Sequence, residues 1–269
     1  MNNEKINSAE TEGFEDDESV EKMLDSVKQD ETESKASILN ARNIYRTSWL
    51  GKIQETKDKI EGSLPRSDKI VIHVHGWRNS RERGTTNAED VRKAYSQTDY
   101  CVSGLIWSSD DTWWNAKEVA DRTGRKLAEF LVEQYEENPE ASIRLQGHSL
   151  GCRVISETVH SLHSMGEASV VDEVVLLGGA VDCRKVQIEG RYGKAFEESV
   201  DSVWSFFFKK DIVLRWIGFY ERSHMIGRRK SRGELASNFT EIEFDAEHHR
   251  GYYRINKMQE ILSIIDKAN

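Results

Sequence analysis

The stretch SIRLQGHSLG, residues 142–151, places a serine between two glycines directly after a run that is predicted to form a strand. Apolar side chains then recur at helical spacing from Leu150 to His163, which predicts a helix. Ser149 therefore lies where a strand turns into a helix. Because a G-x-S-x-G pattern also arises by chance in unrelated chains, the segments around this junction decide what it means.

The same alternation of strand and helix continues along the chain. Apolar runs rich in β-branched or aromatic residues predict strands at residues 69–76, 101–107, 173–182, 202–208 and 240–244, the last near an edge of the sheet. Helical spacing predicts helices at 86–96, 114–137, 194–200 and 256–267, the first with Thr86 and Glu89 as a capping box. Strands that alternate with helices of about ten residues or more form a mostly parallel sheet covered by helices on both faces. The predicted fold class is α/β.

Composition divides the 269 residues into three parts. Residues 1–37 hold 12 acidic residues and four lysines, whereas the rest of the chain holds 35 acidic and 34 basic residues. We expect this acidic tail to be disordered, since it has too little apolar surface to offset the entropy of ordering. The alternative is an acidic segment that binds a protein partner, which no residue identifies. Residues 38–65 are predicted to form a leading helix, up to about Ile60, and a linker, and residues 66–269 the α/β domain.

Nothing near the start of the sequence is typical of a signal peptide, and no apolar stretch reaches the roughly 18 residues that a membrane span requires. We therefore expect a cytoplasmic location. Cys101, Cys152 and Cys183 are odd in number and widely spaced, which favours reduced thiols over a disulfide framework.

Ser149 is a candidate nucleophile because of its neighbours. Gly147 and Gly151 are small enough to let helix and strand pass closely, and the hydroxyl of Ser149 would project at a helix N-terminus, where developing negative charge is favoured. Two backbone N–H groups are needed to hold an oxyanion. Leu150 would supply one and Trp77, in the segment HVHGW, the other. The competing interpretations are a glycine-rich turn with a solvated serine, and Gly76 as a plain strand terminator.

HVHGW, then a strand and helix, then GHSLG, then a late aspartate and a later histidine resemble the α/β-hydrolase superfamily, of the lipase and esterase type. The resemblance covers roughly residues 66–269. It implies an acid after a late strand, and Asp211 directly follows the predicted strand SVWSFFF and two lysines. Asp211 also suits a turn that begins a helix at Ile212. Asp182, at the end of the preceding predicted strand, is the alternative acid.

The resemblance also implies a histidine after the last strand, where EFDAEHHRGYY presents two. We prefer His249, because its spacing to Tyr252 is similar to the histidine loop of these hydrolases; His248 is the alternative. His73 and His75 alternate onto one strand face, but no nearby acidic or histidine series completes a hydrolytic metal site. We expect neither a metal nor a cofactor, and His75 orients the loop that follows it.

The segment from Cys183 to Val200 is short and polar, which predicts little or no cap and an open site. Residues 211–237 mix apolar and basic side chains. Their apolar part would wall an acyl pocket, while the basic part, 222–232, would meet an anionic head group or a membrane surface. The alternative is a packed helix followed by a solvated basic loop. Trp107, Trp113 and Trp114 would either line the site or pack helix against sheet.

The resemblance implies a serine hydrolase that cleaves a carboxylic ester, thioester or lipid acyl bond through an acyl-enzyme. Acyl transfer and peptide cleavage use the same three side chains. The alternative from another class is a non-catalytic scaffold with the acidic tail as its binding element. We do not expect nucleic-acid binding, because one basic loop on a near-neutral body lacks a positive face.

Overall fold

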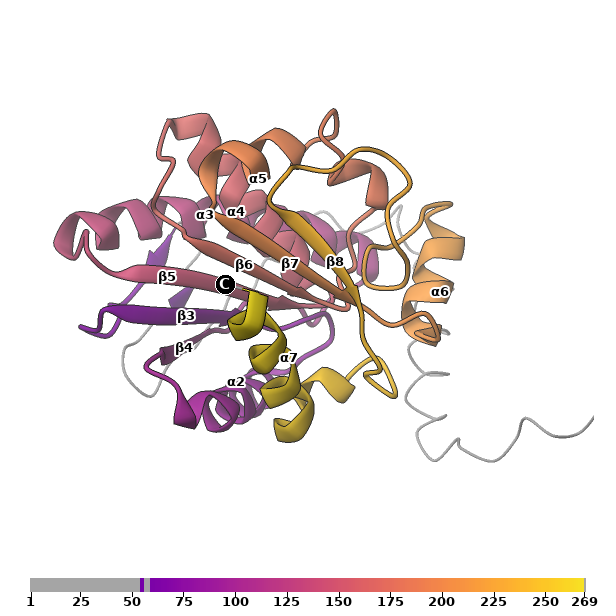
Figure 1. Ribbon diagram of the computed structural model, residues 1–269, viewed down its shortest axis with the longest axis horizontal. Coiled ribbons are helices and arrows are strands. Elements are labelled where there is room, and N and C mark those ends of the chain that lie inside the picture. The colour runs from indigo at the N-terminus through magenta and orange to yellow at the C-terminus, as the bar shows by residue number, and fades with distance from the viewer. Residues whose placement is uncertain (1–53, 56–58, 269) are drawn as a thin grey trace, which may run out of the picture. The chain divides into compact units, whose positions relative to one another are not determined.

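A computed structural model of the chain describes residues 54–55 and 59–268. Figure 1 shows a central sheet with helices on both sides. In the described residues this sheet has six strands in the order β4-β3-β5-β6-β7-β8, and every neighbouring pair is parallel. The strands are β3 (Lys69–Val74), β4 (Cys101–Leu105), β5 (Ser142–His148), β6 (Glu173–Leu177), β7 (Ser202–Phe207) and β8 (Phe239–Glu243). The α/β class is therefore confirmed, and β8 is an edge strand as predicted.

Helices cover the two faces of the sheet unequally. In Figure 1, α3, α4 and α5 lie on one face and α2 and α7 on the other, and α2 contacts α7. The helices are α2 (Arg81–Ala94), α3 (Trp113–Glu137), α4 (Gly151–Met165), α5 (Gly193–Ser199), α6 (Ile212–Tyr220) and α7 (Ile255–Ala268), with short 3₁₀ turns η1 (Tyr95–Gln97), η2 (Cys183–Lys185) and η3 (Gly251–Tyr253). None of the helices in the described ranges is both long and apolar enough to cross a bilayer.

The core lies on both sides of the sheet. The closing helix α7 buries the face that its spacing predicts, and its inward residues are Met258, Ile261, Leu262 and Ile265. They join a cluster with Val71, Phe206 and Tyr252, which come from β3, β7 and η3. The last helix thereby packs the end of the chain against the strands that precede it.

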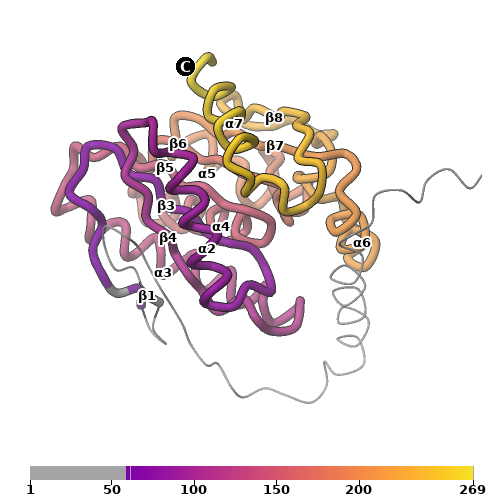
Figure 2. Tube along the Cα trace, turned by 90° about the horizontal axis from the view of Figure 1, so that it is seen from below, coloured from indigo at the N-terminus to yellow at the C-terminus, as the bar shows by residue number. Residues whose placement is uncertain are grey.

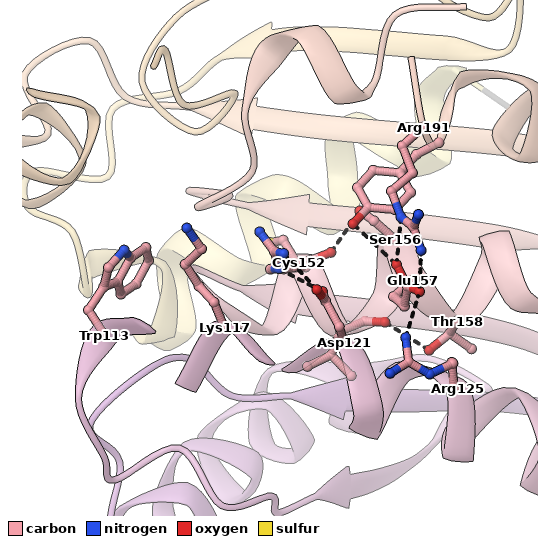
Figure 3. Close-up of polar contacts among 12 residues, drawn as sticks. Trp113, Lys117, Asp121, Arg125, Cys152, Ser156, Glu157, Thr158 and Arg191 are labelled. Carbon is pink, nitrogen blue, oxygen red and sulfur yellow. Dashed lines mark hydrogen bonds and ion pairs between the residues drawn. The ribbon is translucent and has the colours of Figure 1, made fainter. Parts of the chain in front are cut away.

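Buried charge ties α3 to α4 on the opposite face. The carboxylate of Glu157, on α4, has an exposed fraction of 1% and accepts hydrogen bonds from Arg125 on α3 and from Arg191, which precedes α5. Figure 3 shows both guanidinium groups directed at this one carboxylate. One turn away, Arg153 forms two hydrogen bonds of 2.7 Å to Asp121. These ion pairs hold α4 in place, and α4 begins two residues after Ser149.

One sequence prediction at the start of the described residues needs correction. Residues 1–53 lie outside the described residues, so the acidic tail and most of the leading helix stay predictions. The end of that helix is wrong, because β1 (Gln54–Glu55) pairs with β2 (Ile60–Glu61) as a short antiparallel hairpin. Gly62 follows with φ of +130°, which no α-helix uses. Loosely spaced apolar residues do not separate helix from strand.

The helix predicted to begin at Thr86 begins earlier. Ser80 is its N-cap, and its hydroxyl accepts a hydrogen bond of 3.2 Å from the Arg83 N–H. Thr86 lies inside the helix and donates its hydroxyl to the carbonyl of Glu82. Serine and threonine are both good N-cap residues. Ser80 is the cap because the loop after β3 is short and the helix begins at Arg81. Strands 101–107 and 173–182 are also shorter than predicted, ending at Leu105 and Leu177.

Candidate functional site

Ser149 occupies a strained turn between β5 and α4. Its φ is +54°, in the left-handed region that a non-glycine residue enters only when its surroundings enforce it. The Ser149 N–H donates to Leu177 at 3.0 Å, and its carbonyl accepts from Cys152 at 3.1 Å and Ala180 at 3.0 Å. The end of β6 and the first turn of α4 thus hold the backbone of the serine on both sides.

The glycines of the pentapeptide are required by close packing. A Cβ on Gly151 would lie 2.2 Å from the Val74 carbonyl oxygen, and a Cβ on Gly147 would lie 2.8 Å from the Cys152 nitrogen. The start of α4 therefore rests against the end of β3, and the predicted reason for two small residues is confirmed. Gly76 is more than a strand terminator, because a Cβ there would come within 2.9 Å of the Ser149 Cβ.

Asp211 is buried at the end of β7 and uses its two carboxylate oxygens differently. Oδ1 accepts the N–H of Leu214 at 2.9 Å, which makes Asp211 the N-cap of α6. Oδ2 accepts from Nδ1 of His249 at 2.6 Å. Both interpretations of this residue in the sequence are therefore realised, since it begins a helix and also faces a histidine.

His249 lies in the tight loop that follows β8. A Cβ on Gly251 would lie 1.6 Å from the Ala246 carbonyl oxygen, so the loop folds back on itself at that point. The imidazole has an exposed fraction of 9%. Its Nε2 lies 2.9 Å from Ser149 Oγ, and its Nδ1 is bound to Asp211. With Nδ1 protonated, Nε2 is free to accept the serine proton.

The structure thus brings together Ser149, His249 and Asp211 from three separate strand ends, 38 and 100 residues apart in sequence. Asp182 lies elsewhere: its carboxylate binds Arg184 and begins η2. His248 is exposed, and its Nδ1 accepts the N–H of Arg250 at 3.2 Å. Neither alternative residue contacts the serine.

The loop after β3 faces Ser149 and is fixed by polar contacts. His75 directs Nδ1 to the Gly76 carbonyl at 3.0 Å, while its Nε2 accepts the Trp107 N–H at 3.2 Å. Burial lowers the pKa of His75 to about 4, which keeps the ring neutral. Asn79 donates to the Gly76 carbonyl at 2.8 Å and completes the support.

The two N–H groups expected at an oxyanion site are Trp77 and Leu150. Within residues 59–268, neither backbone N–H has a hydrogen-bond acceptor, although both residues are buried. Since backbone N–H groups of buried residues are normally paired, both amides are available to bind an acceptor atom. That these amides hold an oxyanion stays a prediction.

His148 is a site residue that sequence reasoning missed. It precedes Ser149 and donates from Nε2 to the backbone carbonyl of His249 at 2.8 Å. Burial and the neighbouring His249 hold the pKa of His148 well below its usual value. The strand that carries the serine is thereby tied directly to the loop that carries the histidine. The only signal in the sequence is the position of His148 beside the serine.

Polar and aromatic groups also fix the segments around the site. Trp107 and Trp113 are buried, whereas Trp114 is 36% exposed. Trp107 packs against His75, so it supports the loop that follows β3.

Between β6 and β7 the described chain forms only η2 and α5, in line with the predicted lack of a cap. No group of three or more metal-ligating side chains occurs in the part of the chain that the structure describes.

Comparison with solved structures identifies the fold. A poly(3-hydroxybutyrate) depolymerase from Bordetella parapertussis, LpqC, superposes with a TM-score of 0.50 over 73% of this chain and 78% of its own, at 11% identity. The chain has the α/β-hydrolase fold. An esterase from Pyrobaculum calidifontis matches 91% of both chains at 14% identity, with a TM-score of 0.48.

Comparison with known sequences gives little information beyond the α/β-hydrolase fold. Residues 102–217 match the model of a family described as a protein of unknown function, DUF726. No curated protein matches the sequence. At such low identity the solved structures show the fold alone, so the chemistry is inferred from the residues that this α/β-hydrolase fold brings together.

Proposed function

We propose that this protein is a serine hydrolase that cleaves a carboxylic ester, thioester or lipid acyl bond through an acyl-enzyme intermediate. The observation that carries the proposal is the position of the His249 imidazole between Ser149 Oγ, at 2.9 Å, and Asp211 Oδ2, at 2.6 Å. A hydroxyl, an imidazole and a buried carboxylate in this order can activate the hydroxyl.

In the proposed reaction, Ser149 Oγ attacks the acyl carbon while its proton passes to His249 Nε2. Asp211 accepts a hydrogen bond from Nδ1–H of His249 and stabilises the imidazolium. The carbonyl oxygen becomes an oxyanion, which the N–H groups of Leu150 and Trp77 would hold. The imidazolium then protonates the leaving alcohol or thiol. Water attacks the acyl-enzyme in the second half, with His249 again taking the proton, and releases the acid and Ser149.

A fluorophosphonate probe tests the proposal, because it reacts only with an activated serine. We expect the wild-type protein to be labelled and Ser149→Ala to lose all labelling. Ser164→Ala is the matched control: Ser164 is an exposed serine on α4 whose hydroxyl only donates to the His160 carbonyl. Its labelling should equal that of the wild type. A wild-type protein that resists the probe would favour a non-catalytic scaffold.

A panel of aryl esters of increasing acyl length, with the corresponding thioesters and anilides, narrows the substrate. The lack of a large cap between β6 and β7, where the described chain forms only η2 and α5, supports acceptance of more than one chain length. Turnover of anilides alone would instead favour peptide cleavage, and product acylated on an added alcohol would favour acyl transfer.

A further inference from the structure

Exposed apolar side chains gather at one place in the described residues. Of the large hydrophobic side chains that are exposed there, four lie on or beside α6 and two elsewhere. The four are Trp114, Ile212, Trp216 and Phe219; the other two are Met165 and Ile255. Phe219 is the most open of them, with an exposed fraction of 72%. Scattered exposed residues are ordinary, but a group of four is a feature to explain.

Three of these residues form one stripe along α6. Ile212, Trp216 and Phe219 are spaced by four and three residues, which places them on the same side of a helix. The opposite side buries Leu214 and Ile217. Trp216 and Phe219 contact each other edge to face, with ring centroids 6.1 Å apart. The helix is therefore packed on one side and presents aromatic rings on the other.

Trp114, on α3, belongs to the same surface. Lys117 Nζ lies 4.4 Å from the centre of the Trp114 ring and 2.6 Å from Oε1 of Glu221, the residue that ends α6. The same carboxylate accepts the indole N–H of Trp113 at 2.5 Å. We call the stripe together with Trp114 the α6 surface. Figures 1 and 2 both show α6 outside the stack of the large sheet and its covering helices.

Basic residues are frequent in the segment that contains α6. Residues 209–232 contain eight lysines and arginines but only two acidic residues. Both acids are already engaged, Asp211 by His249 and Glu221 by Lys117. Backbone hydrogen bonds of 2.7 Å from Cys183 to His224 and of 2.9 Å from Ile226 to Val181 hold the basic loop in place. This loop is therefore held against the chain that leaves β6. Four of the basic residues are exposed and lie on α6 or within three residues of it: Lys209, Lys210, Arg215 and Arg222.

From this juxtaposition we propose that the α6 surface docks on a bilayer that contains anionic lipids. Aromatic side chains partition into the interface between head groups and acyl chains, and nearby lysines and arginines are attracted to anionic head groups. A helix with one apolar side, nine residues long, lies in the plane of the interface rather than across it. A purely apolar protein partner would not account for the excess of basic residues on and next to α6.

The position of α6 links this surface to the candidate site. Asp211 begins the helix, so docking would bring the strand end that carries the acid close to the lipid. The inference deepens the proposed function by naming a membrane lipid as the substrate that carries the acyl bond. The identity of the substrate rests on the proposed function, whereas the docking does not. Binding to lipid needs no catalysis and is measured separately.

The test is co-sedimentation of full-length Ser149→Ala with phosphatidylcholine vesicles and with mixed phosphatidylcholine and phosphatidylserine vesicles. We expect binding to the mixed vesicles only. Adding Trp216→Ser and Phe219→Ser should weaken it roughly tenfold or more, since two interfacial aromatic anchors are lost. Met165→Ser with Ile255→Ser is the matched control, because it removes the two exposed apolar residues that lie elsewhere, and it should leave binding unchanged.

Charge is tested in the same assay. Lys210→Glu with Arg215→Glu should weaken binding by at least roughly twentyfold, about fivefold for each cation removed. Lys194→Glu with Lys267→Glu, exposed residues on α5 and α7, changes net charge equally and is expected to have a much smaller effect. Thermal unfolding of each variant shows that it is folded.

No binding to mixed vesicles, or binding that the α6 variants and their controls reduce alike, overturns the proposal. So does a dimer of the purified chain that Trp216→Ser and Phe219→Ser dissociate while vesicles are not bound, because the surface would then serve a second copy. Labelling of the wild type by fluorophosphonate together with absent vesicle binding rejects the docking alone and leaves the proposed hydrolase intact.

Discussion

At the scale of single residues, the site depends on groups that do two things at once. Asp211 caps α6 with one oxygen and holds His249 with the other. Ser149 combines a strained backbone with a hydroxyl 2.9 Å from the imidazole. The serine, its glycines and the loop after β3 can be predicted from sequence because their roles are local. The contact of His148 with His249 cannot, since it joins positions 101 residues apart.

Replacing the acid separates its two functions. Asparagine is also a good N-cap, so Asp211→Asn should keep α6 and the stability of the fold. It cannot stabilise the imidazolium and favours the wrong tautomer, so we expect kcat/KM for an ester to fall by about 10⁴-fold. Asp182→Asn is the control and should retain full turnover. If only Asp182→Asn abolishes turnover, Asp211 is not the acid.

His148 should position the base without touching substrate. His148→Leu removes the hydrogen bond to the His249 carbonyl, and we expect kcat to fall by up to about tenfold, the worth of about one such bond, with KM nearly unchanged. His160→Leu, at a half-buried histidine further along α4, is the comparison and should keep its kcat. Steady-state kinetics on a soluble aryl ester measure both, and equal kcat values for wild type and His148→Leu would exclude the positioning role.

At the scale of elements, a buried ion pair joins two neighbouring strands. Arg144 on β5 and Glu173 on β6 are paired with side chains exposed by only 3% and 9%. Glu173 also accepts the indole N–H of Trp204 at 2.8 Å, and Arg144 lies 4.3 Å from the centre of the Tyr100 ring. The sequence predicts these strands correctly but not the pair, because register decides which side chains meet.

Breaking this pair should be costly. Glu173→Ala removes the carboxylate partner of a buried guanidinium and the acceptor of an indole N–H, so we expect the free energy of unfolding to fall by about 3–5 kcal/mol. The surface pair Lys69–Asp99, whose side chains are 48% and 87% exposed, is the control, and Asp99→Ala should cost less than about 1 kcal/mol. Urea unfolding compares the two. Equal losses would mean that the buried pair adds nothing specific.

Helices and strands could be predicted from the sequence where the pattern of neighbouring residues alone determines them. The strands and α7 follow from apolar spacing, whereas the start of α2 depends on which of two capping residues the loop after β3 reaches. The sequence IVLRWIGFY is apolar on nearly every side, so it favours a packed helix. The exposure of Trp216 and Phe219 depends on the lack of a covering segment within the described residues, which helical spacing cannot show.

At the scale of the whole molecule, neutral buried histidines make stability depend on pH. Burial, with a smaller effect from His75, lowers the pKa of His73 to about 3, and burial lowers that of His75 to about 4. His148 is lowered in the same direction. Below about pH 6.5 the unfolded chain takes up protons at these positions while the folded protein does not. Acid therefore favours the unfolded state.

We expect the free energy of unfolding to fall as the pH drops from about 6.5 to about 4, with each histidine contributing at most about 1.4 kcal/mol per pH unit. His75→Gln should flatten this slope, whatever it does to stability at pH 7. Urea midpoints measured across the range give both slopes. A stability that stays constant over this range would contradict the burial of these histidines in their neutral form.

The cytoplasmic location stays a prediction.

The close approach of α4 to β3 also bears on how this chain can be altered. With the Val74 carbonyl 2.2 Å from where a methyl group on residue 151 would sit, even alanine there must push the helix away from the strand. Any library of variants of this chain should therefore keep positions 147 and 151 constant. Changes in the chain between β6 and β7 should likewise spare Ala180 and Arg191, whose contacts with Ser149 and Glu157 hold the serine and α4 in place.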